Sequence, residues 1–178
     1  IDVAEDQAHT FPKLPDLDEA GADGEENTAA QQKAVADQAA EFDEDTVKSI
    51  HKAELEKLAD NIDALLDTDN LTRDERAALE TLLEQVEDMI HTINKVAADS
   101  KIAKDTVDAY DPATVKSTDK ASIETALDTI KNLLGTKHLT VAEREALEKA
   151  KADAEALLEA IEEAAKAAGT DNTAKVED

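Results

Sequence analysis

Several residue types on which whole classes of protein chemistry depend are missing or scarce in this chain. It has 178 residues, with no cysteine, no tryptophan, four glycines and three prolines. Without cysteine the chain has no disulfide, no thiol nucleophile and no zinc–thiolate site. No apolar run reaches the roughly 18 residues that a membrane-spanning helix needs, so we expect no membrane insertion.

Basic charge is also scarce. The chain has 44 acidic and 19 basic residues, which gives a formal net charge of −25. Such a chain repels phosphate, which excludes nucleic acid as a partner, and it repels anionic lipid surfaces. The charge can serve solubility alone, or it can steer a basic partner. We expect a monomer.

Motifs for catalysis and metal binding are missing as well. The chain has no H-E-x-x-H, no G-x-S-x-G and no glycine-rich phosphate loop. No two of its four histidines have the i, i+4 spacing of a helical zinc pair; they are His9, His51, His91 and His138. The sequence therefore predicts no enzyme and no cofactor.

One segment resembles the opening of a calcium loop. Asp67-Thr68-Asp69-Asn70 has the acidic spacing, but an EF-hand also needs glycine at its sixth position and glutamate at its twelfth. Those positions hold Thr72 and Ala78. We therefore predict no metal site, and the sequence identifies no catalytic, cofactor-binding or partner-binding residue.

Composition divides the chain into a central part and two ends. Residues 1–27 hold nine acidic residues, one lysine, two glycines and two prolines. A segment so polar cannot offset its ordering entropy, so we expect an acidic linker or arm. Gly169 is typical of a helix end, so residues 169–178 are expected to form a tail. The residues between these ends are mostly strong helix formers.

The central part repeats itself at an offset of 68 residues. When residues 43–96 are placed over residues 111–164 without gaps, 22 of the 54 pairs are identical. A period of this length indicates consecutive structural units. We expect one unit over residues 28–97 and a second over residues 98–168. Both units contain i, i+4 charge pairs that predict ion pairs on helix surfaces: Lys52–Glu56, Arg76–Glu80, Lys120–Glu124 and Arg144–Glu148.

Each unit is expected to contain three amphipathic helices. Apolar residues recur at helical spacing in three stripes of the first unit, each with a counterpart 68 residues later. The stripes are Val35, Ala39 and Phe42; Leu55, Ala59, Ile62 and Leu66; and Leu79, Val86, Ile90 and Ile93. Capping boxes at Thr72–Glu75 and Thr140–Glu143 predict the starts of the third helices.

The other helix borders are predicted from weaker signals. In the first unit we expect the second helix over about Asp45–Asp67. In the second unit, Asp111-Pro112 resembles an N-cap followed by proline at the first helical position.

The predicted fold is all-α, with two tandem three-helix bundles. A helix with one apolar stripe has to bury it against others. Because no glycine or proline lies between Thr72 and Asp111, the third helix of the first unit is expected to continue into the second unit. The result would be a rod like the spectrin-type arrays. The alternative is a break near Ala98-Asp99-Ser100.

Three scarce side chains are possible binding anchors. Phe42, Met89 and Tyr110 are large residues of the kind that form hot spots in interfaces. Phe42 and Tyr110 lie in the predicted stripes and Met89 lies in the third predicted helix, so we expect all three in the core.

The second unit resembles repeats of Gram-positive secreted and cell-wall proteins, in particular the FIVAR family (found in various architectures). The resemblance lies in helix-forming positions of the segment from Tyr110 to Ile161, and both units share it. The positions are Tyr110-Asp111-Pro112, Ile123, Ala126-Leu127, Leu133-Leu134, Leu139-Thr140, Glu143, Ala146-Leu147 and Leu157-Leu158. It implies a non-catalytic three-helix module that is extracellular or attached to the cell wall.

The resemblance leaves more than one function open. Some bacterial three-helix modules bind a host protein of the immunoglobulin or albumin class, or a matrix protein, and tandem copies would add avidity. The alternatives are a spacer or stalk, and an accessory module of a secreted glycoside hydrolase. The chain begins with isoleucine and has no signal peptide, so we expect a part of a longer exported protein.

Overall fold

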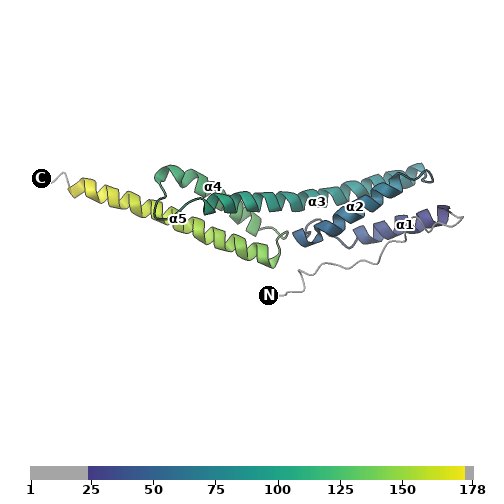
Figure 1. The fold of residues 1–178 in the computed structure, drawn as a ribbon, viewed down its shortest axis with the longest axis horizontal. Helices are drawn as coiled ribbons and strands as arrows, with labels where there is room; N and C mark the ends of the chain where they lie inside the picture. The colour runs from purple at the N-terminus through teal and green to yellow at the C-terminus, as the bar shows by residue number, and fades with distance from the viewer. Residues whose placement is uncertain (1–23, 175–178) are drawn as a thin grey trace. The chain divides into compact units, whose positions relative to one another are not determined.

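The computed structural model describes residues 24–174, with the side chains of residues 28–169 (Figure 1). Every regular element in these residues is a helix, and no strand occurs among them. In chain order the elements are α1 (Gly24–Ala39), the 3₁₀ helix η3 (Ser49–His51), α2 (Lys52–Leu66), α3 (Arg73–Asp108), the 3₁₀ helix η4 (Ser117–Asp119), α4 (Lys120–Leu134) and α5 (Val141–Ala174). The predicted all-α class is confirmed.

The chain divides into two units, residues 1–95 and residues 96–178. We call them unit 1 and unit 2 and describe each by itself. The sequence predicts the border between residues 97 and 98. The long helix α3 contributes residues on both sides of the border, and it continues without interruption through Ala98, Asp99 and Ser100, where a break was the alternative.

The core of unit 1 is built from α1, α2 and the first part of α3. Seven of its eleven buried residues belong to the three predicted stripes. Val47 precedes α2, and Leu58, Leu65 and Met89 lie beside the stripes on α2 and α3. Phe42, Ala59, Leu66 and Ile90, which were predicted in the stripes, are only partly buried. The buried residues are Val35, Ala39, Val47, Leu55, Leu58, Ile62, Leu65, Leu79, Val86, Met89 and Ile93. Burial of these side chains is the main stabilising contribution to the unit.

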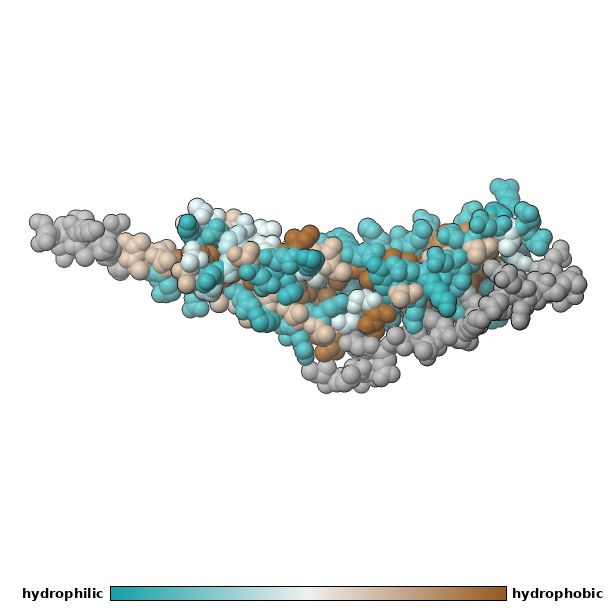
Figure 2. Space-filling model, viewed as in Figure 1, coloured by the Kyte–Doolittle hydropathy of each residue, from teal (hydrophilic) through white to brown (hydrophobic). Residues whose placement is uncertain are grey.

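The core of unit 2 mostly uses the repeat-equivalent positions, supplied by the end of α3, by α4, by α5 and by Leu139 just before α5. The buried set is Ala103, Val107, Ile123, Ala126, Leu127, Ile130, Leu133, Leu139, Leu147, Ala150, Ala154, Leu157 and Ile161. Alanine replaces larger residues at several positions, so this core contains smaller side chains than that of unit 1. The opposite surfaces are charged, and Figure 2 shows hydrophilic residues over most of the face drawn.

Both predicted capping boxes are confirmed. At the start of α3 the backbone N–H of Thr72 donates to Glu75 Oε2 over 2.8 Å, and the N–H of Glu75 donates to Thr72 Oγ1 over 3.3 Å. Thr140 and Glu143 repeat the pair at the start of α5, with distances of 2.8 Å and 3.2 Å. Hydrogen bonds from the Thr72 hydroxyl and, second, from its backbone hold the pKa of Glu75 below its usual value.

The ends of α2 and α4 are held by two arginines, whose role the sequence did not predict. Arg76 donates from one guanidinium nitrogen to the carbonyl oxygen of Leu66 (2.7 Å) and from the other to that of Thr68 (3.3 Å). Arg144 makes the same two bonds in unit 2, at 2.6 Å and 2.9 Å. These carbonyls lie at helix ends, where the helix itself supplies no donor.

This arrangement corrects part of the charge-pair prediction. The pairs Lys52–Glu56 and Lys120–Glu124 are present at 3.6 Å and 3.7 Å. Arg76 and Arg144 instead turn toward the preceding helix end, because a carbonyl without a partner in the helix gains more from a charged donor than an exposed carboxylate does.

The predicted starts of the second helices are wrong, in both units for the same reason. Asp43 Oδ1 accepts the N–H of Asp45 (3.0 Å), and the Asp43 carbonyl accepts those of Thr46 and Val47 (2.9 and 3.0 Å). These bonds close a turn, and Lys48 is extended at φ −131°. Helix α2 therefore begins only at Lys52, not near Asp45.

Asp111 forms the equivalent turn in unit 2. Its Oδ1 accepts the N–H of Ala113 (2.8 Å), and its carbonyl accepts those of Thr114 and Val115. Pro112 lies inside this turn and does not occupy the first position of a helix, as the sequence predicted. An aspartate before a proline starts a turn as readily as a helix, and α4 begins at Lys120.

The two predicted end segments lie mostly outside the described residues. Residues 1–23 of the acidic arm are not described, and α1 begins at Gly24 rather than at residue 28. At the other end, α5 continues through Gly169 to Ala174, where the sequence predicted a helix end before the tail. Glycine is tolerated inside a helix at a cost of about 1 kcal/mol, so by itself it does not end one.

Candidate functional site

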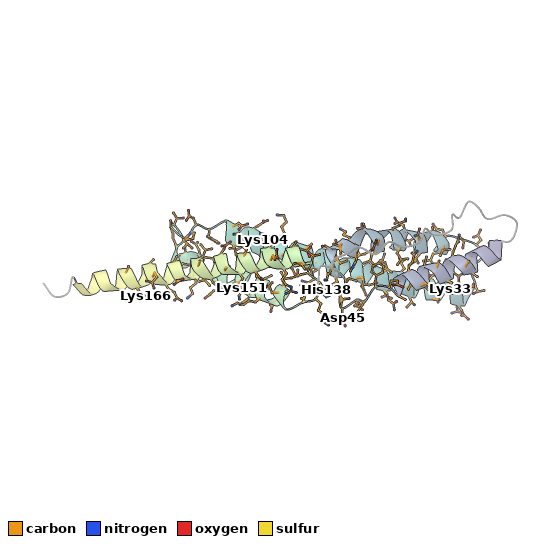
Figure 3. All side chains as sticks on the ribbon, turned by 90° about the horizontal axis from the view of Figure 1, so that it is seen from below. Lys33, Asp45, Lys104, His138, Lys151 and Lys166 are labelled. Atoms are coloured by element: carbon orange, nitrogen blue, oxygen red, sulfur yellow. The ribbon has the colours of Figure 1, made fainter. Side chains whose placement is uncertain are left out.

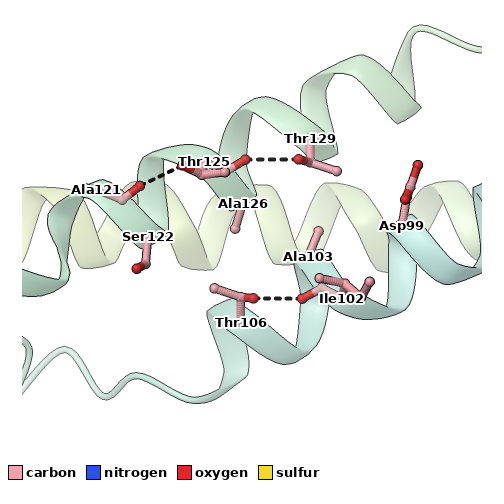
Figure 4. Close-up of a pocket in the computed structure, with 9 residues that line it drawn as sticks. All are labelled: Asp99, Ile102, Ala103, Thr106, Ala121, Ser122, Thr125, Ala126 and Thr129. Atoms are coloured by element: carbon pink, nitrogen blue, oxygen red, sulfur yellow. Dashed lines mark hydrogen bonds between the residues drawn. The ribbon is translucent and has the colours of Figure 1, made fainter.

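The surface of unit 2 has a groove between the end of α3 and helix α4 (Figure 4). It has a volume of about 460 Å³ and is lined mostly by alanine, serine and threonine. Its walls are Asp99, Ile102, Ala103 and Thr106 on α3, and Ala121, Ser122, Thr125, Ala126 and Thr129 on α4. Figure 4 shows Ala103 and Ala126 pointing toward one another between the two helices.

The threonine hydroxyls of the groove donate to their own helices. Thr106 Oγ1 donates to the carbonyl of Ile102 (2.8 Å), Thr125 Oγ1 to that of Ala121 (2.8 Å) and Thr129 Oγ1 to that of Thr125 (3.0 Å). With their hydroxyl protons engaged in this way, the three threonines offer mainly methyl groups to the groove. The other polar side chains of the lining are Asp99 and Ser122.

Ile102 stands at the edge of the groove and is 65% exposed. It is the one large hydrophobic residue that is exposed among the described side chains. A single exposed apolar residue needs no explanation by itself. Next to an apolar groove, however, it extends a surface that a partner could cover.

Unit 1 has a different surface at the equivalent positions. Leu58 stands where unit 2 has Ala126, and both are buried, at 2% and 5% exposed; Lys57 replaces Thr125, and Glu54 replaces Ser122. Ala34 occupies the position of Ile102. The face between the first two helices therefore carries longer side chains in unit 1, whereas unit 2 combines small walls with one protruding isoleucine.

A second and smaller hollow lies in unit 1 between α1 and α3, with a volume of about 330 Å³. Its walls include Phe42 and Met89, which also pack in or against the core of this unit. We do not take it as the candidate site, because no exposed large apolar residue stands beside it among the described side chains.

Charged side chains around the grooves mostly form ion pairs along single helices. Lys101 pairs with Asp105, Lys104 with Asp108 and Lys120 with Glu124, all at i, i+4 spacing. Figure 3 shows Lys33, Lys104, Lys151 and Lys166 along the helices, and each pairs with a carboxylate of its own helix. A hydrogen bond from Lys149 to Asp153 on α5, together with that carboxylate's charge, raises the pKa of Lys149.

The histidines do not form a site in the described part of the chain. His51 Nδ1 accepts the backbone N–H of Lys48 (3.1 Å) at the start of η3, and its ring meets that of Phe42 edge-on. Asp119 takes the same role in unit 2, where its Oδ2 accepts the N–H of Lys116 (2.9 Å). His138 lies in the loop before α5, His91 lies within α3, and His9 is outside the described residues.

The segment Asp67–Asn70 is the loop between α2 and α3, and its main contacts are structural. Thr68 Oγ1 donates to the carbonyl of Leu65 over 2.7 Å, and the carbonyl of Thr68 accepts from Arg76. Within residues 24–174, no three His, Asp or Glu side chains are grouped so as to hold a metal ion.

Of the three scarce residues, only Met89 lies in a core as predicted, whereas Phe42 and Tyr110 are partly buried at the edge of the cores. Met89 is 5% exposed in the core of unit 1, and Phe42 packs against that core. Tyr110 packs against the core of unit 2.

The groove was missed in the sequence although a signal was present. The signal was the exchange of long for small residues at three positions of one helix face: Glu54 for Ser122, Lys57 for Thr125, and Leu58 for Ala126. Reading it requires knowledge of which faces of the first and second helices meet, and that depends on the turn before α4.

Comparisons of the chain with protein-family models, curated proteins and solved structures find no match. None of the described helices is both long enough and apolar enough to cross a membrane.

Proposed function

We propose that the chain is a non-catalytic helical module of an exported bacterial protein, and that unit 2 binds a partner protein on its α3–α4 face. The observation that carries this proposal is Ile102, 65% exposed at the edge of a groove with apolar walls. Protein-binding surfaces commonly combine an exposed apolar anchor with a polar rim.

The class of partner is proposed from the resemblance of unit 2 to Gram-positive surface repeats. A module of that kind is extracellular or attached to the cell wall, where it meets host proteins. The partner would then be an immunoglobulin, albumin or a matrix protein. The chain as a whole would contribute the adhesive function of a longer surface protein.

Retention of a serum protein on the immobilised chain tests this proposal. We expect retention by the natural chain and a loss of at least about ten-fold in Ile102→Asp, because the change places a charge on the apolar edge of the groove. Ala156→Asp on the exposed surface of α5 is the matched control, since it adds the same charge away from the groove. Retention unaffected by Ile102→Asp would contradict the proposal.

We further propose that the two units are tandem three-helix bundles that share α3 in a rod. Support comes from the composition of each core and from the uninterrupted helix Arg73–Asp108. Small-angle X-ray scattering of the full chain tests this arrangement. An elongated particle is expected, and a scattering curve of a compact globule would contradict it.

A rod favours the second candidate function, a spacer that holds a neighbouring adhesive or glycoside hydrolase domain away from the cell wall. Such a spacer needs stiffness and charge but no binding surface. It would give an elongated particle and retain no serum protein, so the two experiments together separate the two functions.

A further inference from the structure

We propose that the groove of unit 2 receives an amphipathic helix of the partner, with an apolar ridge flanked by Lys or Arg. The inference rests on the proposed binding function and names the chemistry of the partner. It follows from three properties of the groove: its hydrogen-bonding groups, the spacing of its walls and its electrostatic surroundings.

The hydrogen bonds favour a helix over an extended peptide. The backbone groups of both walls are used within α3 and α4, and the hydroxyl protons of Thr106, Thr125 and Thr129 go to their own helices. An extended peptide would bury its backbone amide and carbonyl groups here without partners, at a cost for each of them. A helix satisfies its own backbone and presents only side chains.

The spacing of the walls fits a helix as well. The lining residues of α3 follow one another at i, i+3, i+4 and i+7 from Asp99 to Thr106, and those of α4 do so from Ser122 to Thr129. Such rows form the ridges and grooves by which helices pack. Ala103 and Ala126, at 2% and 5% exposed, lie at the bottom of the groove, so a third helix would pack over them between the threonines, with Ile102 against its side.

Charge determines what flanks the apolar ridge. Residues 96–178 contain 18 acidic and 11 basic residues, and the whole chain has a net charge of −25. Of the unit 2 lysines on the groove helices, Lys101, Lys104 and Lys120 pair with Asp105, Asp108 and Glu124, and Lys131 lies at the end of α4 beyond the groove. The field that an approaching helix meets is therefore negative. It attracts Lys and Arg and repels an acidic helix.

The inference also predicts one site per chain. In unit 1 the positions equivalent to Ser122 and Thr125 carry the longer Glu54 and Lys57, so the small walls are missing there. The two repeats would then differ in role, with unit 1 as scaffold and unit 2 as the binding unit.

The test uses the full chain and three synthetic peptides of about 20 residues, long enough to form helices. The first has Leu and Ala in one stripe and Lys elsewhere, the second has Glu in place of Lys, and the third has the composition of the first in scrambled order. Amide chemical shifts from ¹H–¹⁵N spectra report where each peptide binds. We expect the first peptide to shift residues 99–106 and 121–129 with one-to-one stoichiometry, and the other two to bind at least about ten-fold more weakly.

A groove-filling variant tests the location. Ser122→Glu with Thr125→Lys places the residues of unit 1 at two exposed positions of the groove and is expected to abolish these shifts. Ala152→Glu with Ala156→Lys, two exposed positions of α5, is the matched control and should bind as the natural chain does. Circular dichroism confirms that both variants are folded.

Three results would overturn the inference. Equal binding of the scrambled peptide, or shifts spread over unit 1, would mean general attraction between charges. Self-association of the chain that Ile102→Asp abolishes, seen by analytical ultracentrifugation, would make a second copy the occupant. Serum retention that depends on Ile102, together with no binding of the Lys peptide, would sustain the binding function and refute the helical partner.

Discussion

At the scale of single residues, the side chains that bond to the backbone explain most of the local structure. Thr72 and Glu75 fix the start of α3, and Arg76, one residue later, holds the end of α2. A single turn of helix thus connects two elements through side-chain hydrogen bonds. The equivalent residues of unit 2 make the same bonds.

Replacement of Arg76 by methionine is expected to destabilise unit 1 by about 2 kcal/mol. The change keeps much of the aliphatic stem but leaves the carbonyls of Leu66 and Thr68 without their charged donor. Urea unfolding followed by circular dichroism measures the loss. Arg73→Met on the exposed surface of the same turn is the control and should cost less than about 0.5 kcal/mol. Equal effects of the two changes would show that the two bonds contribute nothing specific.

Glu75→Gln is expected to remove one pH-dependent contribution to stability. Because the pKa of Glu75 is lowered in the folded state, its ionised form stabilises the protein above the unfolded pKa of about 4.3. This contribution is lost as the pH falls through the lower folded value. The difference in unfolding free energy between the natural chain and the variant should therefore shrink below about pH 4.

Glu84→Gln, on the exposed surface of the same helix, controls for the loss of one negative charge. A difference that stays constant from neutral to acid pH for Glu75→Gln would contradict the role assigned to the cap.

At the scale of helices, the predictability of each border depends on the range of the interaction that sets it. The starts of α3 and α5 were predictable because a capping box is complete within four residues. The starts of α2 and α4 were not, because Asp43 and Asp111 can cap a helix or close a turn, and the burial of Val47 in the core favours the turn.

The arginine bonds and the groove were harder still to predict. Arg76 reaches a carbonyl ten residues earlier, and this contact exists only once α2 and α3 are antiparallel. The groove depends on how α3 and α4 are each oriented about their own axes, because Ala126 lines it only when it faces Ala103. Local sequence patterns contain the residues that form the arginine bonds and the groove, but they do not show which residues far apart in the chain lie side by side.

The prediction at the scale of helices concerns the continuity of α3. Ala98→Pro, near the border between the units, should cost about 3 kcal/mol, because proline removes a backbone hydrogen bond and clashes with the preceding turn. We expect the amides around Ala98 to lose protection from hydrogen exchange. Ala98→Ser keeps the backbone bonds and should cost only about 0.5 kcal/mol. Undiminished protection in the proline variant would mean that α3 does not continue through this point in solution.

At the scale of the whole molecule, charge dominates. The chain carries 44 acidic and 19 basic residues, and many of the lysines are paired within single helices at exposed positions. Such pairs contribute little, so the net effect of the charges is repulsion within the folded chain.

Added salt should therefore stabilise the protein. Raising the sodium chloride concentration from about 0.01 M to about 1 M shortens the Debye length from about 30 Å to about 3 Å. This screens the repulsion and should raise the midpoint of thermal unfolding by several degrees. A midpoint that falls with salt would show that the lysine pairs outweigh the surplus of carboxylates.

The bonds of Arg76 and Arg144 to main-chain oxygens have a consequence for the history of the duplication. After a segment is duplicated, the two copies can accept substitutions freely only where a side chain makes no hydrogen bond to the main chain. Threonine, glutamate and arginine are unchanged at the starts of α3 and α5, whereas Glu54, Lys57 and Leu58 on one face of α2 are replaced in α4. Such a molecule can acquire a new specificity on one copy while the other preserves the ancestral framework.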